Sequence, residues 1–269
     1  MKKFNLMFVL ILFSLPLFAQ EDSGNVNISF SISPPPIGAV DKYYEDESNT
    51  EPVKAIGFSY SNISSDIFNL SNISVDYSEN YIKSKVGILY SNMSVFVGWG
   101  EIDTGFDNSK TGTFDFGFLA GVNFQTKLFY EEKLKIFLAP GLDVSMTMMN
   151  YKIKNYPVIN YNTWPWSISY KDVDCNTYIT SILPKISFQI NYKLTPEVEI
   201  IPFVTGVSNL SVVNVYIESE KFSDDFSYIS INFGLEAIFF GQYQLSSMVQ
   251  MLNDASKTKI INISFSVPL

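Results

Sequence analysis

Apolar and polar residues alternate along most of the chain after its first twenty positions. The alternation is clearest over Phe114–Gln125 and Ile229–Phe239, where most of the intervening positions are Ser, Asn, Gly or acidic residues. Successive side chains of a β-strand point to opposite faces, so a period of two predicts strands with one apolar and one polar face. No later stretch shows a comparable helical period, and the mature chain is therefore predicted to be all-β.

The alternating stretches and the gaps between them suggest an architecture. The predicted strands lie near residues 25–33, 54–62, 67–77, 81–90, 93–100, 113–128, 134–146, 178–193, 197–208, 226–240, 243–251 and 258–268. The connections alternate mostly between long gaps (34–53, 101–112, 147–177, 209–225, and a moderate one at 252–257) and short turns (63–66, 91–92, 129–133, 194–196, 241–242). Only a short turn at 78–80 breaks this rhythm. The layout is typical of an antiparallel up-and-down transmembrane β-barrel, here of about 12 strands with 10 as the alternative.

Strand length and aromatic placement support the same architecture. Several predicted strands reach the 9–11 residues that a tilted strand needs to cross a bilayer. Aromatic side chains gather near strand ends, as at Tyr60, Trp99, Tyr192, Phe240 and Tyr243. Over its mature length the chain resembles the bacterial outer-membrane β-barrel proteins. Its last strand, apolar at alternate positions, resembles their C-terminal assembly signal but ends in leucine instead of an aromatic residue. The resemblance implies outer-membrane lipid and the barrel assembly machinery as partners.

The first residues have the pattern of an export signal. Lys2 and Lys3 precede the apolar run Phe4–Phe18, and Leu17-Phe18-Ala19 offers a small-residue cleavage site. The run is short for a membrane-spanning helix. We expect a signal peptide over residues 1–19 and a single barrel domain over residues 20–269, exported to the bacterial outer membrane.

The composition excludes several classes of chemistry. All 18 basic residues are lysine, and the chain has no histidine and no arginine. Catalytic arrangements that need an imidazole cannot form, and neither can histidine-ligated metal sites. With 27 acidic residues the net charge is −9, so a nucleic-acid backbone would be repelled. We therefore predict no enzyme activity, no catalytic residues, no cofactor, no metal site and no nucleic-acid partner.

Three functions remain open from the sequence. The first is a surface-exposed structural protein of the outer membrane, with or without a narrow pore, and the second is a porin-like diffusion channel for small solutes. The third is a secreted soluble β-barrel or sandwich that binds a ligand. Charges on the predicted inner face would either pair across strands or form a selectivity ring. These candidate lumen charges are Lys83, Lys85, Asp115, Lys127, Lys135, Asp143, Lys185, Lys193, Glu199 and Glu236.

The longest predicted connection, 147–177, carries the remaining candidates. Trp164 and Trp166, with Tyr161 and Tyr170 beside them, would either contact a surface ligand of unknown identity or fold onto the barrel mouth. Cys175, the only cysteine, is expected at the end of this connection on the cell exterior, where a maleimide would reach it. Burial of the thiol at the barrel rim is the alternative.

Overall fold

The computed structural model describes most of the chain after residue 53. The described residues are 54–66, 68–83, 87–103, 110–126, 129–131, 136–160, 162, 164–217, 220–241, 243–253 and 257–269. The predicted signal peptide and the predicted strand at 25–33 lie outside them. No helix in the described part of the chain is long and apolar enough to cross a membrane.

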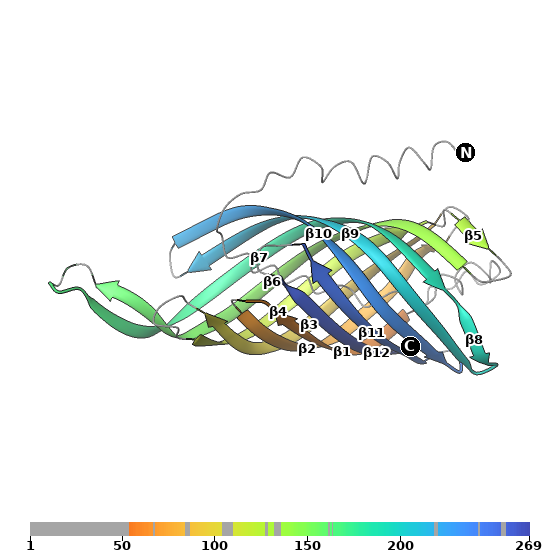
Figure 1. Cartoon of the computed structure of the whole chain (residues 1–269), viewed down its shortest axis with the longest axis horizontal. Helices are drawn as coiled ribbons and strands as arrows, with labels where there is room; N and C mark the ends of the chain where they lie inside the picture. Colours follow the sequence, from red (N-terminus) through yellow and green to blue (C-terminus); the bar gives the residue numbers. More distant parts are fainter. Residues whose placement is uncertain are drawn as a thin grey trace.

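The described residues form one antiparallel sheet that closes on itself (Figure 1). Ten strands, called the staves below, make the wall: β1 (Lys54–Ser64), β2 (Phe68–Lys83), β3 (Ile88–Asp103), β4 (Lys110–Gln125), β6 (Ile136–Asn160), β7 (Ser167–Ile190), β9 (Val198–Ile217), β10 (Glu220–Phe239), β11 (Tyr243–Leu252) and β12 (Lys259–Pro268). Pairing of β1 with β12 completes the ring. Two short strands, β5 (Phe129–Glu131) and β8 (Tyr192–Thr195), add to β6 and β9. The predicted barrel is confirmed, with twelve strands of which ten form the wall.

The two ends of the barrel differ. β1 begins and β12 ends at one end, called the terminal end, which also carries β5 and β8 (Figure 1). At the opposite end, called the hairpin end, β6 and β7 continue past their other neighbours. Their pairing runs up to Asn160 and Ser167, although β4 pairs with β6 only as far as Ile153. The result is a two-stranded ribbon, the β6–β7 hairpin, that projects beyond the barrel in green in Figure 1.

The register fixes the dimensions of the wall. Hydrogen-bonded partners followed once around the barrel lead from Ile238 on β10 back to Asp224 on the same strand, fourteen residues away. With the usual rise and spacing of β-strands, this stagger over ten staves gives a tilt of about 45° and a backbone radius of about 11 Å. Inward side chains from opposite staves can therefore approach one another across the lumen.

The two faces of the wall have opposite chemistry. On every stave, apolar side chains point outward and are about half exposed, as for Ile231 (46%) and Phe233 (47%) on β10. Their neighbours Ser230 (1%) and Asn232 (6%) point inward and are buried. The predicted assignment of apolar residues to the outside and small polar residues to the lumen is confirmed on this strand.

Four predicted connections were wrong. The turns expected at 78–80 and 91–92 lie inside β2 and β3, so the three strands predicted over 67–100 are two. Ser, Asn and Glu near residue 79 suggested a turn, but these residues continue the ladder between β2 and β3, which shifts register only between Asn80 and Ile82. Most of the gaps 147–177 and 209–225 is also strand, because β6, β7, β9 and β10 keep pairing where their outer faces become polar.

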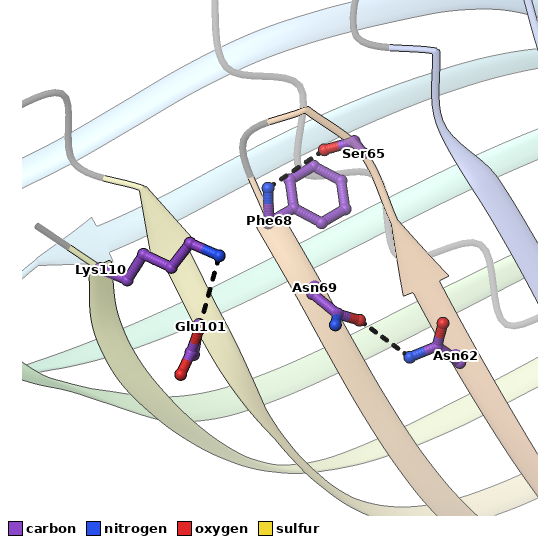
Figure 2. Close-up of polar contacts among 6 residues, drawn as sticks. All are labelled: Asn62, Ser65, Phe68, Asn69, Glu101 and Lys110. Atoms are coloured by element: carbon purple, nitrogen blue, oxygen red, sulfur yellow. Dashed lines mark hydrogen bonds and ion pairs between the residues drawn. The ribbon is translucent and has the colours of Figure 1, made fainter. Parts of the chain in front are cut away.

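Polar contacts organise the hairpin end of β1 to β4 (Figure 2). The Phe68 N–H lies 3.2 Å from Ser65 Oγ, and Ser65 N–H donates to the Phe68 carbonyl at 2.9 Å, which tightens the β1–β2 turn. Asn62 Nδ2 donates to Asn69 Oδ1 at 2.9 Å across the same pair of strands. This rim is short and polar compared with the long β6–β7 hairpin.

Candidate functional site

An apolar layer crosses the lumen near the hairpin end. Its members touch one another and come from all ten staves, although β10 contributes only half-buried side chains. Named stave by stave, the layer includes Ile63 (β1), Phe68 and Leu70 (β2), Phe96 (β3), Leu119 (β4), Met149 and Tyr151 (β6), Val173, Cys175 and Ile179 (β7), Val213 (β9), Phe226 and Tyr228 (β10), Leu252 (β11) and Ile260 (β12). Apolar side chains from every side therefore meet inside the barrel.

The layer is tightly packed at its large side chains. Phe96 is 2% exposed, and its ring lies over Gly117 of β4, where an added Cβ would come within 2.2 Å of the ring. Leu70 covers Gly100 of β3 in the same manner. Glycine at these two positions gives the larger neighbour the volume that a side chain would occupy. Interiors packed this closely exclude water.

Between the layer and the terminal end, the lumen is polar. Small hydroxyl and amide side chains from most staves are buried there. Several of their atoms have no hydrogen-bond partner among the described groups, including Asn72 Oδ1, Asp76 Oδ2, Asn123 Oδ1, Asn232 Oδ1 and Asn262 Oδ1. These atoms have almost no accessible surface, so the neighbouring side chains enclose them. This part of the interior is therefore filled mainly with polar side chains, with a small apolar cluster of Ile201 and Ile238 near the terminal end.

The structure places four of the candidate lumen charges inside. Asp115, Asp143, Lys185 and Glu236 are on the inner face, and Lys185 Nζ lies 2.9 Å from both carboxylate oxygens of Asp143. Both side chains of this pair are only 10% exposed. A buried pair of this kind neutralises its own charge, as expected if inward charges pair across strands. Among the described residues, no group of three or more Cys, Asp or Glu side chains is arranged to hold a metal ion.

The other candidate charges are not placed in the lumen. Lys193 is exposed on β8, which is not a stave, so its assignment to the lumen was wrong. The alternation of apolar and polar residues continues past Ile190, the last residue of β7. The sequence therefore gave no sign that the strand ends there and that β8 begins at Tyr192. Glu199, half-buried, stands opposite Lys193 at the rim of the terminal end. Lys83 ends β2 and its side chain is not described, and Lys85, Lys127 and Lys135 lie outside the described residues.

The aromatic candidates lie on the β6–β7 hairpin, away from the barrel mouth. Trp164 is 87% exposed, Trp166 62% and Tyr170 57%, and the two indole rings meet edge to face at 6.3 Å. Tyr156 on the facing strand is also exposed, whereas Tyr161 lies outside the described residues. These rings do not pack on the barrel, so they form an accessible apolar surface at the end of the hairpin.

Cys175 is not on an exposed connection as expected. It is fully buried within β7, where odd-numbered residues near it face the lumen, and it belongs to the apolar layer. The expectation failed because β7 begins at Ser167 and not near Tyr178. Burial, the alternative raised from the sequence, is what the structure shows.

The sequence reasoning missed two features of the lumen. Asp76 was not among the candidate charges, although it is 4% exposed and points inward from β2. The apolar layer was also missed, although adjacent apolar residues interrupt the alternation where it lies, as in Val95-Phe96-Val97 and Phe118-Leu119-Ala120. A stave whose two faces are both apolar at one height produces such a run.

Comparisons with known proteins agree on the fold. No protein-family model matches the chain, and no curated protein matches it. Similar solved structures include the beta domain of the Bordetella autotransporter BrkA (6% identity, 81% of this chain and 100% of that chain, TM-score 0.42). An outer-membrane channel from Pseudomonas putida F1 (8%, 84% and 98%, 0.40) and the outer-membrane protease OmpT from Escherichia coli (7%, 81% and 93%, 0.42) are also similar.

These neighbours are bacterial outer-membrane β-barrels, which is the resemblance expected from the sequence. A β-barrel fold by itself selects no function. At such low identities and TM-scores, function has to be derived from this chain's own surfaces.

Proposed function

We propose that this chain is an integral outer-membrane β-barrel protein whose lumen is closed by the apolar layer and which presents the β6–β7 hairpin at the cell surface. The observation that carries the membrane location is the apolar outer face. Each of the ten staves exposes at least two large apolar side chains outward, while Ser, Asn, Thr and Gln fill much of the inside. A soluble barrel would place its apolar face inside, away from water.

The outer face of β10 supports a membrane boundary. From Ile229 to Leu235 its outward side chains are apolar, whereas Lys221, Ser223, Asp225 and Ser227 are outward at its hairpin end. Pairing with β11 stops at the same height, at Ser230. Unpaired strand edges do not occur in the hydrocarbon region, so the change of chemistry and the end of pairing agree on where lipid stops.

The apolar layer favours a closed barrel over a diffusion channel. A channel for hydrated solutes needs a continuous polar path, and an apolar constriction prevents conduction by excluding water. Here every stave adds a side chain to the layer, and the tight fit of Phe96 over Gly117 shows close packing within it.

The orientation follows from the usual layout of these barrels, in which long extensions face the cell exterior and short turns the periplasm. The terminal end would then be periplasmic, in keeping with the signal peptide expected over residues 1–19. The β6–β7 hairpin would stand above the outer leaflet and present Trp164, Trp166 and Tyr170 to a partner at the cell surface. Large rigid rings provide contact area at low entropic cost.

The experiment measures ion conductance of purified protein in planar bilayers, after a gel has shown that the unboiled protein migrates faster than the boiled protein. The wild type is expected to be silent. The double variant Phe96→Ser/Leu119→Ser, which replaces two members of the layer, should conduct because water can enter the gap. The matched control is Val95→Ser/Phe116→Ser, which makes the same kind of change on the outer face and should stay silent.

Steady conductance by the wild type would contradict the closed lumen and favour the diffusion channel. Identical migration with and without boiling, together with recovery in the aqueous fraction, would contradict the membrane location and favour the secreted soluble protein.

A further inference from the structure

The far end of the β6–β7 hairpin carries no charged residue. Residues 156–170, whose described members are called the hairpin tip below, contain no Asp, Glu or Lys. The segment consists of Trp, Tyr, Ile, Val and Pro together with Ser, Asn and Thr. Protein sequences on average carry about one charged residue in four. A charge-free segment of this length is therefore unusual where the chain projects farthest beyond the barrel (Figure 1).

The apolar side chains of the hairpin tip lie on both faces of the ribbon. Tyr170 pairs with Pro157, and residues that pair across two strands share a face. Tyr156, next to Pro157 on β6, faces the other way, so the two tyrosine rings point to opposite sides. Ile159 and Ile168, which pair with each other, lie on the Tyr170 side. A partner that covers one face of the ribbon would leave the rings of the other face in water.

The exposed ring area is small for a stable contact between two proteins. An aromatic side chain presents about 150–250 Å², so the exposed fractions of Trp164, Trp166, Tyr156 and Tyr170 leave about 500 Å² of ring surface in water. A patch of this size commonly marks a binding site. A stable protein interface, including one with a second copy of this chain, buries about 800 Å² from each partner. Because the rings face both ways, an occupant that surrounds the hairpin tip fits them better than one flat partner.

The charges beneath the hairpin tip are balanced. Three lysines and two aspartates on β6 and β7 give a net charge of +1, and all five are exposed: Lys152, Lys154, Lys171, Asp172 and Asp174. Lys152 Nζ lies 3.8 Å from Asp172 Oδ2. The rim of the neighbouring staves also carries both signs, as in the pair of Lys110 and Glu101 at 3.7 Å. No dominant sign is present that would select a charged partner.

The protein's own bilayer lies too far below the hairpin tip to cover it. Met148 and Tyr178 form the last outward apolar pair on the two strands, and the outward residues just beyond them are polar. From Tyr178 to Tyr170 the ribbon rises by about 20 Å at a tilt of about 45°. The headgroup layer is only about 5–8 Å thick. Lipid that contacts the hairpin tip therefore belongs to a different membrane.

We propose that the hairpin tip docks into the headgroup layer of a second phospholipid membrane that faces the cell. Its indole rings lie where headgroups meet acyl chains, and its tyrosine rings lie among the headgroups, because an apolar ring with a polar atom is stable at this boundary. A fluid headgroup layer surrounds the ribbon and covers both faces at once. The inference rests on the proposed function for the placement of the hairpin at the cell surface, and it names the partner there.

The backbone of the hairpin limits how deeply the tip inserts. β4 pairs with β6 only as far as Ile153, and β9 pairs with β7 only from Cys175. In the described part of the chain, neither edge of the ribbon beyond these residues has a further partner strand. Strand edges of this kind do not enter hydrocarbon, so the hairpin docks on the second membrane and does not span it.

The test mixes full-length protein in lipid nanodiscs with sucrose-loaded phosphatidylcholine vesicles and measures how much protein sediments with the vesicles. Binding should be unchanged in high salt, because charges contribute little to it. Trp164→Ala/Trp166→Ala should reduce it at least tenfold, since affinity for a lipid surface scales with the buried apolar area. The matched control Tyr192→Ala/Phe240→Ala removes two similarly exposed rings from the terminal end and should bind like the wild type. Gel migration of unboiled samples shows that each variant is folded.

Brominated lipids in the vesicles measure the depth of insertion. In a Trp99→Phe background the remaining tryptophans are both in the hairpin tip. Bromine close to the headgroup end of the acyl chains should quench their fluorescence more than bromine near the chain ends. Trp164→Phe/Trp166→Phe keeps Trp99 on the outer face of the barrel. This variant detects any transfer of brominated lipid into the nanodisc and should not be quenched.

No sedimentation with vesicles, or equal sedimentation of the tip variant and the terminal-end variant, would overturn the proposal. Binding confined to anionic vesicles and lost in high salt would also overturn it and leave only surface attraction. Self-association of the wild type that the tip variant loses, without vesicle binding, would assign the hairpin tip to a second copy instead. Normal gel migration without vesicle binding refutes this inference alone, whereas identical migration with and without boiling refutes the proposed function as well.

Discussion

The membrane location predicts that lysine on β10 is tolerated according to its height on the outer face. Phe233, Ile231 and Ser227 all point outward on the same stave. With a strand tilt of about 45°, two residues that are two positions apart on a stave differ in height along the barrel axis by about 5 Å. If lipid begins near Ile229, Phe233 lies about 10 Å deep, close to the middle of an apolar band about 25 Å tall.

The expected cost follows from this depth. About half of the Phe233 side chain is exposed to lipid, and loss of about 100 Å² of apolar contact costs about 2.5 kcal/mol. Lysine near the middle of the bilayer adds about 2–4 kcal/mol. Phe233→Lys should therefore lower the free energy of unfolding by about 5 kcal/mol, and Ile231→Lys by less because its ammonium reaches the interface. Ser227→Lys, above the boundary, should change it by no more than about 0.5 kcal/mol.

Equilibrium unfolding of the protein in lipid vesicles, followed by tryptophan fluorescence in increasing guanidinium, measures these differences. Asn232→Lys is the comparison on the lumen face, where the surroundings are polar, and it should cost much less than Phe233→Lys. Equal unfolding free energies for Phe233→Lys and Ser227→Lys would refute a lipid environment for the outer face.

Three other predictions concern the lumen. Gly117→Ala, which places a Cβ 2.2 Å from the Phe96 ring, should destabilise the barrel by about 1–3 kcal/mol, whereas Gly206→Ala, with nothing closer than 3.8 Å, should not, as unfolding curves will show. Lys185→Met leaves its carboxylate partner buried and unpaired and should cost about 3–5 kcal/mol by the same measurement, unless that partner is made apolar as well. A membrane-impermeant maleimide should label Cys175 only after unfolding, and labelling of intact cells would contradict its burial.

The fold was largely predictable from the sequence because the barrel has a strict period of two. Each stave must present apolar groups to the outside and polar groups to the lumen, and a shift by one residue would exchange the faces. The positions of Ile231, Phe233, Ser230 and Asn232 follow from this rule alone. The number of staves could not be predicted from this rule, because Ser and Asn near residue 79 are equally suited to a turn and to a polar lumen face.

The ends of the long strands could not be predicted for a related reason. Above the lipid boundary the outer face is no longer required to be apolar, so the alternation fades although the ladder continues. β7 therefore extends from Tyr178 back to Ser167, and β10 from Phe226 back to Glu220, through residues with the composition of loops. Backbone hydrogen bonds, which any residue can make, hold these extensions together.

The proposed closure of the lumen depends on the positions where the alternation of apolar and polar residues fails. Outside the layer most inward residues are polar, and inward apolar residues such as Phe137, Ile201 and Met248 are fewer. At the height of the apolar layer, inward apolar residues are favoured instead, because each is buried against apolar side chains from other staves. Phe96 and Leu119 gain this burial only because the remaining staves supply partners at the same height. The sequence of a single strand cannot reveal the layer, because one apolar run such as Val95-Phe96-Val97 would also occur in a strand that is buried on both faces. When the register brings such runs to the same height on neighbouring staves, they support the proposed closed barrel over an open channel.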